Sequence, residues 1–525
     1  MKRLLSRSPR LLFAALLTLA GATACTTDAG GSADGIGGAD ATGGTFSALH
    51  CTGAEGDKAV APDNPVGISL PPQRVCLNVT LASFLAAAKG DVQPSAMVKD
   101  SAGNAYFTGM TKGFLDTTYG DLFVAKVSPS GTLTWFMTYG GAKKDAFPLT
   151  GVHDPSDGVE GMLAIDDADK LYVVGNRNAT EGFIVKLDAD GTALWAKGVA
   201  KQAFQSVSVA SGTVHVAGDG GIFALDAATG DNLGQLGLKL KSGAASRMFA
   251  VKATAAGAIY LGGWAGFSGD DDATLFKLSH DATTKAYTVV WDKRIPAPKG
   301  SKISSIDVAA DASIYVGLNT TGATDVRVEV LKFGADGTMT WARRYGDTLQ
   351  SKTDVVKVIG TQVVVGGNTL ATGTATFSDG KNGDGMLLLI NADGSLAKEH
   401  YFFTGTNPAS YDSVRDVEVK DGKLYVITDH FGVANFGEWR DPNEYGEGKL
   451  KHAWKTVAVS DYLLQATDLE QGTLPEMQDV SSLKDFDAKW SDLTANAPLK
   501  PAAAGVGSGH NAAVFSIIDA YIPAK

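Results

Sequence analysis

The stretch KLYVVGNRNATEGFIVKLDADGTALWAKGV, residues 170–199, contains three strand signals. The runs 170–175, 182–187 and 192–199 are rich in β-branched and aromatic residues, which favour strands. Asp-Ala-Asp-Gly (188–191) separates the last two runs and is typical of a tight turn, because its glycine tolerates a positive φ. Variants of this stretch recur along the chain, so it defines a repeating β unit.

Seven copies of the unit align on their second strand, at intervals of about 53 residues, a period typical of propeller-type repeats. Each copy has a preceding strand and most have two following strands, joined by short turns. A four-stranded unit cannot bury both of its faces alone, so such units stack in a ring. We therefore predict an all-β protein, a seven-bladed β-propeller of four-stranded antiparallel blades. The second strands are 104–109, 170–175, 213–218, 258–263, 313–318, 362–367 and 423–428.

Aromatic residues recur at two positions of the unit. The second strand carries a tyrosine in most copies, with His215 and Val364 as exceptions, and the fourth strand often carries a tryptophan. Because blades must bury their faces against each other, we interpret these rings as packing between blades and not as a ligand cage. They are Tyr106, Tyr172, Tyr260, Tyr315 and Tyr425, with Trp135, Trp195, Trp291 and Trp341.

The pattern GNAYFTG…DLFVAKVSPSGTLTWFMTYGG (103–141) resembles the bacterial seven-bladed β-propeller repeat (SBBP) of exported proteins. The resemblance covers residues 92–429 and 511–521, and it implies the fold and export but no particular reaction. A second likeness is local. ALDAATG (224–230) is similar to part of the tryptophan-docking motif of quinoprotein dehydrogenases, but Asn232-Leu233-Gly234 stands where that motif has its tryptophan.

The N-terminus has the organisation of a lipoprotein signal peptide over residues 1–24. A basic start is followed by a short apolar run, and small residues then lead directly to Cys25. This resembles a bacterial lipobox, which implies lipidation of Cys25, although Ala22 replaces the usual leucine. The alternative is ordinary signal cleavage after Ala24. Residues 25–50 read as a flexible tether, so we expect an outer-membrane lipoprotein of the cell envelope, facing the periplasm or the cell surface.

Two further cysteines, Cys51 and Cys76, complete the set of three. In an exported chain they are expected to form a disulfide, and the alternative is two buried free thiols. The net charge of −11 without a basic cluster argues against a nucleic-acid partner. We expect a monomer whose only membrane contact is the lipid anchor.

Residues 51–429 hold the predicted blades, and the last blade is irregular. Its third strand matches 512–519, within the C-terminal segment 512–525, and we predict that an N-terminal strand near 74–82 pairs with it and closes the ring. The insert 430–511 lies between strands of this blade. Apolar spacing within it predicts an amphipathic helix over 481–494.

Ser481 or Ser482 is the candidate N-cap of that helix. We expect Phe486 and Trp490 to dock on the face of the ring that carries the long connections, with the whole insert packed on that face or projecting from it.

The second-to-third and fourth-to-first connections are the long ones, and in up-and-down blades both lie on one face. Function concentrates on loops held by a rigid scaffold, so we predict partner-binding residues there: Trp264, Asp271, Trp439 and Tyr445. No cofactor is predicted. Asp270–Asp272 is a candidate to help hold a calcium ion, with a solvated acidic loop as the alternative. We assign no catalytic residue and no definite metal ligand, since no spacing typical of either occurs.

These observations favour a lipid-anchored envelope propeller that binds a protein, a glycan or an envelope component through its long-loop face. The alternative is an enzyme on a propeller scaffold, either a quinoprotein-like dehydrogenase or a hydrolase or lyase. A purely structural role in the envelope is a third reading. Fold alone cannot separate the three.

Overall fold

The computed structural model divides the chain into two units, Met1–Gly35 and Ile36–Lys525. It describes residues 44–45, 78–85, 91–112, 120–129, 133–140, 162–177, 181–241, 245–267, 270–296, 300–320, 327–345, 351–370, 383–404, 412–420, 423–431, 436–438, 456–458, 464–482, 489–492 and 510–518. All of them lie in the second unit. The predicted signal peptide, the lipidation site Cys25 and the cysteines Cys51 and Cys76 lie outside these residues.

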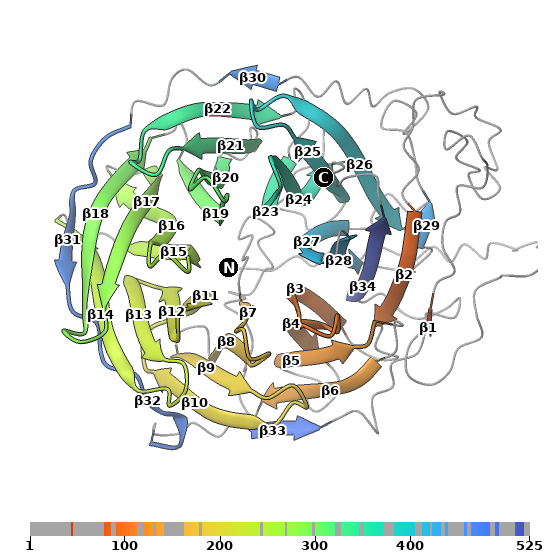
Figure 1. Cartoon of the computed structure of the whole chain (residues 1–525), viewed down its shortest axis with the longest axis horizontal. Helices are drawn as coiled ribbons and strands as arrows, with labels where there is room; N and C mark the ends of the chain where they lie inside the picture. Colours follow the sequence, from red (N-terminus) through yellow and green to blue (C-terminus); the bar gives the residue numbers. More distant parts are fainter. Residues whose placement is uncertain are drawn as a thin grey trace, which may run out of the picture. The chain divides into compact units, whose positions relative to one another are not determined.

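The second unit is a β-propeller, whose four-stranded antiparallel blades are arranged around a centre (Figure 1). Six blades each take four consecutive strands, whereas the repeat predicts seven such blades. Blades 1 to 3 are β3 (Asp91–Lys99), β4 (Ala105–Lys112), β5 (Gly120–Val127) and β6 (Leu133–Gly140); β7 (Leu163–Ile165), β8 (Leu171–Arg177), β9 (Glu181–Leu187) and β10 (Ala193–Val199); and β11 (Phe204–Ala210), β12 (Thr213–Gly218), β13 (Gly221–Asp226) and β14 (Asn232–Leu240).

Blades 4 to 6 continue the pattern. They are β15 (Ser246–Ala253), β16 (Ile259–Phe267), β17 (Asp270–Asp281) and β18 (Ala286–Ile295); β19 (Ser301–Val308), β20 (Ile314–Thr320), β21 (Val328–Phe333) and β22 (Met339–Tyr345); and β23 (Ser351–Ile359), β24 (Gln362–Leu370), β25 (Gly383–Ile390) and β26 (Leu396–Thr404).

A further sheet combines both ends of the described chain, and we call it the composite sheet. Its order is β27 (Asp412–Lys420), β28 (Lys423–Phe431), β34 (His510–Ile518), β2 (Asn78–Leu85) and β1 (Gly44–Thr45). β2 pairs antiparallel with β34, so the predicted pairing of the N-terminal strand with the last strand is confirmed. β27 packs against β3 of blade 1 and against β23 and β24 of blade 6.

Four neighbouring pairs of blades share one device, which we call a clasp. In blade 1, Tyr106, Lys126 and Trp135 are cross-strand neighbours on β4, β5 and β6. Their polar tips converge on the carbonyl oxygen of Ala189, in the β9–β10 turn of blade 2: the lysine Nζ at 3.0 Å, the indole Nε1 at 3.2 Å and the tyrosine hydroxyl at 3.4 Å. The prediction that these rings pack between blades is confirmed.

The other three clasps repeat this geometry on the equivalent turns. Each acceptor is an alanine carbonyl, and a glycine with positive φ follows in the same turn. A Cβ added at Gly337 would lie 2.9 Å from the Trp291 ring. Only glycine therefore lets the indole pack against this turn. Blade 2 uses Tyr172, Lys186 and Trp195 on Ala227, blade 4 uses Lys277 and Trp291 on Ala335, and blade 5 uses Trp341 on Ala392.

The described strands of the insert add to the outer edges of the blades, so the prediction that the whole insert packs on the long-loop face or projects from it is wrong. After β28, the described residues 436–438, 456–458, 464–482 and 489–492 lie along the outer rim of the blades, and we call these residues the belt (Figure 1). Its strands add to the fourth strands of blades 6, 5, 3, 2 and 1 in that order, and Gln465 pairs with Arg294 of blade 4. They are β29 (Phe436–Glu438), β30 (Thr456–Ala458), β31 (Leu469–Gly472), β32 (Gln478–Asp479) and β33 (Lys489–Asp492).

The physical reason for the belt is the outer edge of each blade, which otherwise exposes unpaired backbone groups. Satisfying these edges outweighs the helical spacing of the apolar residues over 481–494. Val480–Ser482 form a 3-10 turn and Lys489–Asp492 form a strand, so the predicted helix and its serine caps are also wrong, with Trp490 in β33. Phe486 lies outside the described residues. No helix among the described residues is long and apolar enough to cross a membrane.

The inner edges are satisfied differently, by side chains from the neighbouring first strand. The Ser305 hydroxyl accepts a hydrogen bond from the backbone N–H of Val356 at 2.7 Å. The Asp416 carboxylate in the composite sheet accepts one from Met97 of blade 1, also at 2.7 Å. The first strands are thereby tied to each other around the centre, which leaves the connections at the strand ends as the variable part of the scaffold.

Candidate functional site

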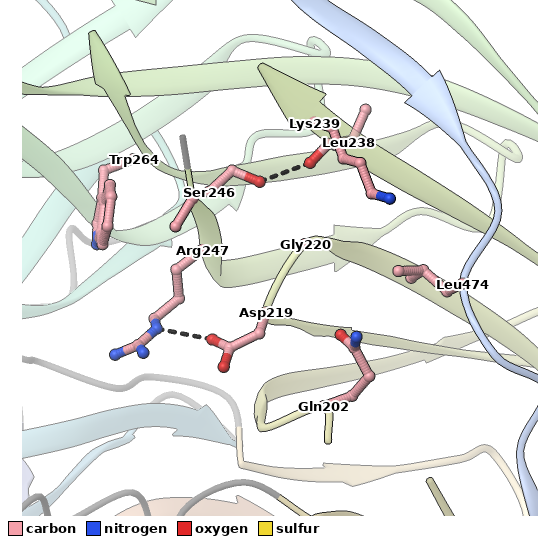
Figure 2. Close-up of a pocket in the computed structure, with 10 residues that line it drawn as sticks. Gln202, Asp219, Gly220, Leu238, Lys239, Ser246, Arg247, Trp264 and Leu474 are labelled. Atoms are coloured by element: carbon pink, nitrogen blue, oxygen red, sulfur yellow. Dashed lines mark hydrogen bonds and ion pairs between the residues drawn. The ribbon is translucent and has the colours of Figure 1, made fainter. Parts of the chain in front are cut away.

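A pocket of about 320 Å³ lies where three connections meet, at the long-loop ends of blades 3 and 4 (Figure 2). It takes Gln202 from the β10–β11 connection, Gly220 from the β12–β13 turn and Ser246 from the start of β15. This volume is at the lower end of the range for small-molecule sites. Its other lining residues are Asp219, Leu238, Lys239, Ala245, Arg247, Trp264 and Leu474.

An ion pair between Asp219 and Arg247 holds the centre of the pocket. The arginine Nε lies 2.7 Å from Asp219 Oδ1, and both side chains are about one-third exposed. The backbone fixes the pair as well, because Asp219 and Arg247 form a β-bridge and the N–H of Gly220 donates to the Ser246 carbonyl at 3.0 Å. Arg247 also lies directly across the sheet from Trp264. The guanidinium and the indole therefore keep fixed positions.

The pair leaves polar atoms facing the pocket. Arg247 contacts Asp219 through Nε, and within the described part of the chain its two terminal nitrogens have no hydrogen-bond partner. Gln202 Oε1 is buried, and it too has no partner among the described residues. Lys239 is exposed at the rim. Burial raises the pKa of Asp219 above its ordinary value, and the charge of Arg247 only partly offsets this. The lining of the pocket thus includes cationic side chains and an aromatic ring, while the Gln202 oxygen is buried.

The opposite wall of the pocket is apolar and comes partly from the belt. Leu474 is 7% exposed and packs over Gly220 and Gly221, and Leu238 on β14 also lines the pocket. A Cβ on Gly221 would lie 2.0 Å from the carbonyl oxygen of Leu236, so a glycine is required at that turn. Gln235 Nε2 donates to the Leu474 carbonyl at 3.0 Å and anchors the belt there. The belt is therefore part of the site.

Of the four predicted partner-binding residues, Trp264 lines this pocket. Asp271 lies in β17, paired with Gly266, because β16 and β17 extend the hairpin to Phe267 and Asp270. The prediction of a long loop over 264–273 is therefore wrong. Trp439 and Tyr445 lie outside the described residues.

The acidic run 270–272 is not a loop site. Asp272 is 3% exposed and accepts a hydrogen bond from Arg294 Nε at 2.7 Å, so its charge is neutralised within blade 4. Within the described residues, no group of three or more His, Cys, Asp or Glu is placed to hold a metal ion. The Asp-Ala-Asp-Gly sequence 188–191 forms a tight turn, as its chemistry predicts: the N–H of Gly191 donates to the Asp188 carbonyl at 2.9 Å.

Sequence reasoning missed Gln202, Asp219, Arg247 and Leu474. Each lies in a different segment, and none carries a motif. A usable signal existed only for Asp219, which follows the second strand at the position where Asn176 and Asn319 stand in blades 2 and 5. Those asparagines hydrogen-bond to the backbone of Phe204 and Thr353 in the next blade. A carboxylate at that position indicates a different partner, which is Arg247.

No protein-family model and no curated protein matches the chain. Solved propellers are similar to it. Sqt1 from Chaetomium thermophilum, bound to the N-terminus of ribosomal protein L10, is 10% identical over 66% of this chain and 96% of its own, with a TM-score of 0.39. A putative 6-phosphogluconolactonase from Bacteroides fragilis is 13% identical over 70% and 97%, with a TM-score of 0.36. Drosophila Plexin A in complex with Semaphorin 1b is 10% identical over 67% and 86%, with a TM-score of 0.37.

Proposed function

We propose that this chain is a binding module of the cell envelope, anchored by lipid on Cys25, that holds a protein partner on its long-loop face. The observation that carries the proposal is the Asp219–Arg247 pair beside Trp264, in a pocket open to that face. An arginine held rigidly next to an aromatic ring is the side-chain set that dominates binding energy at protein interfaces. Arg247 lies on β15, and Asp219 lies in the β12–β13 turn and is bridged to it, so both are held by a rigid scaffold, which favours recognition over movement.

We further propose that the composite sheet acts as the seventh blade and closes the ring. Support comes from the packing of β27 against both blade 6 and blade 1. Closure removes the free edges that an open array would expose. A rigid closed ring keeps the long-loop face constant in shape, which a binding surface requires.

Site-specific photo-crosslinking in cells of the source organism tests the binding proposal. A photoreactive residue replaces Lys239, which is exposed at the pocket rim, and in a second strain it replaces Thr229. Thr229 is the matched control, because it is exposed in the turn at the opposite end of the same blade. We expect a discrete protein adduct from position 239 and none from position 229. Equal adducts from both positions, or none from position 239, would contradict the proposal.

The anchor is tested separately. Cys25→Ala should move the protein from the membrane fraction to the soluble fraction, and mass spectrometry should find a diacylated N-terminus on the unsubstituted protein. An unmodified N-terminus at Cys25 would contradict the anchor while leaving the binding face untouched.

A further inference from the structure

We propose that the outer edge of blade 4 pairs with the same edge of a second copy of this chain and forms a symmetric dimer. The surface is the stretch 286–291 of β18, which we call the open edge. None of its residues lines the pocket, so the proposal goes beyond the binding module and does not depend on it. It also departs from the monomer that the sequence favours.

The open edge is the part of the rim that the belt leaves uncovered. Within the described residues, the belt adds a strand to each of the other five contiguous blades, whereas the sheet of blade 4 ends at β18. The belt meets β18 only near its end. There Gln465 and Arg294 exchange two backbone hydrogen bonds, and the N–H of Thr467 donates to the Asp292 carboxylate. The belt then pairs with blade 3 through β31, so no described strand lies beside 286–291.

The open edge lacks the features that protect the unpaired parts of the other fourth strands. In blade 3 the unpaired part is interrupted by Gly234, and in blade 6 it carries Lys398 and Glu399. Breaks and charges of this kind keep edges from pairing with another chain. The open edge, Ala-Tyr-Thr-Val-Val-Trp, has no charge and is rich in strand-forming residues. In blades 1, 2 and 5 the unpaired parts are short: 133–136, 193–196 and 339–342.

The pairing with β17 determines which backbone groups of the open edge point outward. Arg294 points outward, to Gln465, and the alternation along the strand, with a bulge at Val290, then makes Tyr287 and Val289 point outward as well. Two antiparallel copies of the edge can therefore exchange hydrogen bonds between Tyr287 of one copy and Val289 of the other. Thr288 then lies opposite Thr288 of the second copy, on the twofold axis. Such threonine pairs are favourable across strands.

This register also covers an exposed apolar side chain. Val290 is 54% exposed, and Leu194 is the other large apolar side chain that is exposed among the described residues. Pairing about Thr288 places Ala286 of the second copy beside Val290, which removes apolar surface from water. A second copy brings the same uncharged edge in a matching register, whereas an unrelated strand matches it only by chance. The open edge therefore favours self-pairing.

Sedimentation equilibrium of the mature full-length protein in detergent solution tests the proposal. The paired edge is short compared with the interfaces of permanent dimers, so we expect a dimer that dissociates reversibly on dilution. A monomer at every protein concentration would overturn the proposal.

Charge substitutions at the twofold axis locate the contact. Thr288→Lys places two like charges opposite each other and should weaken dimerisation about tenfold, and Thr288→Glu should do the same. An equimolar mixture of the two variants should recover the dimer, because each lysine then faces a glutamate. Thr288 is exposed, so both variants should keep the unfolding midpoint of the unsubstituted protein.

The matched control is Thr340→Lys, at an exposed position of the outermost consecutive strand of blade 5, β22. It should dimerise as the unsubstituted protein does. Undiminished dimerisation of Thr288→Lys, an equal loss in Thr340→Lys, or a mixture that fails to recover the dimer would each overturn pairing through the open edge.

Discussion

The interfaces between blades are of two kinds. In four of them the tryptophan indole of one blade donates to an alanine carbonyl in a turn of the next blade, and this contact is lacking between blade 3 and blade 4 and between blade 6 and the composite sheet. In blade 3 the equivalent positions are His215, Ala224 and Gly234. A Cβ on Gly234 would lie 2.2 Å from the carbonyl oxygen of Lys285, so the turn of blade 4 fills the place of the indole.

Blade 6 lacks the clasp for another reason. Its equivalent positions are Val364, Leu389 and Lys398. The third and fourth strands of the composite sheet are β34 and β2, which come from opposite ends of the chain and have no turn between them. A tryptophan on the fourth strand of blade 6 would therefore find no turn carbonyl to accept its indole N–H. The comparison shows that a blade carries the clasp residues only where the next blade has a turn that can accept their hydrogen bonds. Where the residues are absent, the turn of the next blade is different or missing.

Ion pairs replace the clasp between blade 6 and the composite sheet. Arg415 bridges Asp354 on β23 at 3.2 Å and Asp429 on β28 at 3.0 Å, and Ser413 donates to Asp354 at 2.6 Å. All four side chains are buried. Burial raises the pKa of Asp354, and the charge of Arg415 opposes this rise. A second ion pair, Lys357 with Glu418 at 2.8 Å, crosses the same interface near its surface, so Arg415 is its buried cation.

The largest expected effect comes from removing that guanidinium. Arg415→Ala would remove the cation that contacts two buried carboxylates, Asp354 and Asp429, so we expect the free energy of unfolding to fall by about 3–5 kcal/mol. Urea unfolding followed by circular dichroism measures it. Arg415→Lys is the companion variant and should fall in between, because an ammonium cannot reach both carboxylates in one plane. An unchanged midpoint for Arg415→Ala would mean that the ion pairs do not hold this interface.

Removing one clasp should lower the free energy of unfolding somewhat less than removing Arg415 does. Trp195→Ala removes a half-buried indole and its hydrogen bond to Ala227, and we expect a loss of about 3 kcal/mol. The control is Leu194→Ala at the adjacent position, where the side chain is 47% exposed, with an expected change below about 0.5 kcal/mol. Equal effects of the two substitutions in urea unfolding would show that the indole is not an anchor.

The smallest expected effect concerns pH at the interface of blades 3 and 4. His215 is buried, its Nδ1 lies 2.8 Å from the Tyr287 hydroxyl and the His280 ring lies nearby. Burial, with a smaller contribution from His280, lowers the pKa of His215 to about 3. In the unfolded chain the His215 imidazole binds a proton below about pH 6.5, whereas in the folded chain it stays neutral there. The free energy of unfolding therefore decreases as the pH falls below that value.

Between pH 7 and pH 5 this histidine should therefore lower the free energy of unfolding by about 2 kcal/mol. His215→Gln should flatten that part of the pH profile, measured as urea midpoints at both pH values. A profile that is as steep in the variant as in the unsubstituted protein would assign the pH dependence to other groups.

The β repeat and its stacking were predictable, because blade strands joined by short turns leave a regular signal in the sequence. Trp135 and Trp195 pack between blades as their spacing predicts, and the N-terminal strand pairs with the last strand as edge protection requires. The belt was not predictable. Its strands of two to four residues carry no periodicity, and each is specified by an edge far away in the chain.

The pocket was only partly predictable for the same reason. Trp264 could be predicted because it is an aromatic residue near a connection. Arg247 and Asp219 carry no sequence signal for a site, because the β-bridge that joins them is formed only in the fold. A helical spacing of apolar residues before Trp490 also misled, because β33 takes its conformation from the edge of β6. Local patterns predict elements that form locally, and non-local pairing overrides them.

The belt also imposes an order of events during biosynthesis. A chain emerges from the ribosome N-terminus first, so β2 is made roughly 400 residues before its partner β34. The belt strands are made after all six contiguous blades and meet them in reverse, from blade 6 to blade 1. β34 therefore pairs with β2 only after all six contiguous blades and the belt strands have been synthesised, so the pairing of the two ends follows the blades in time.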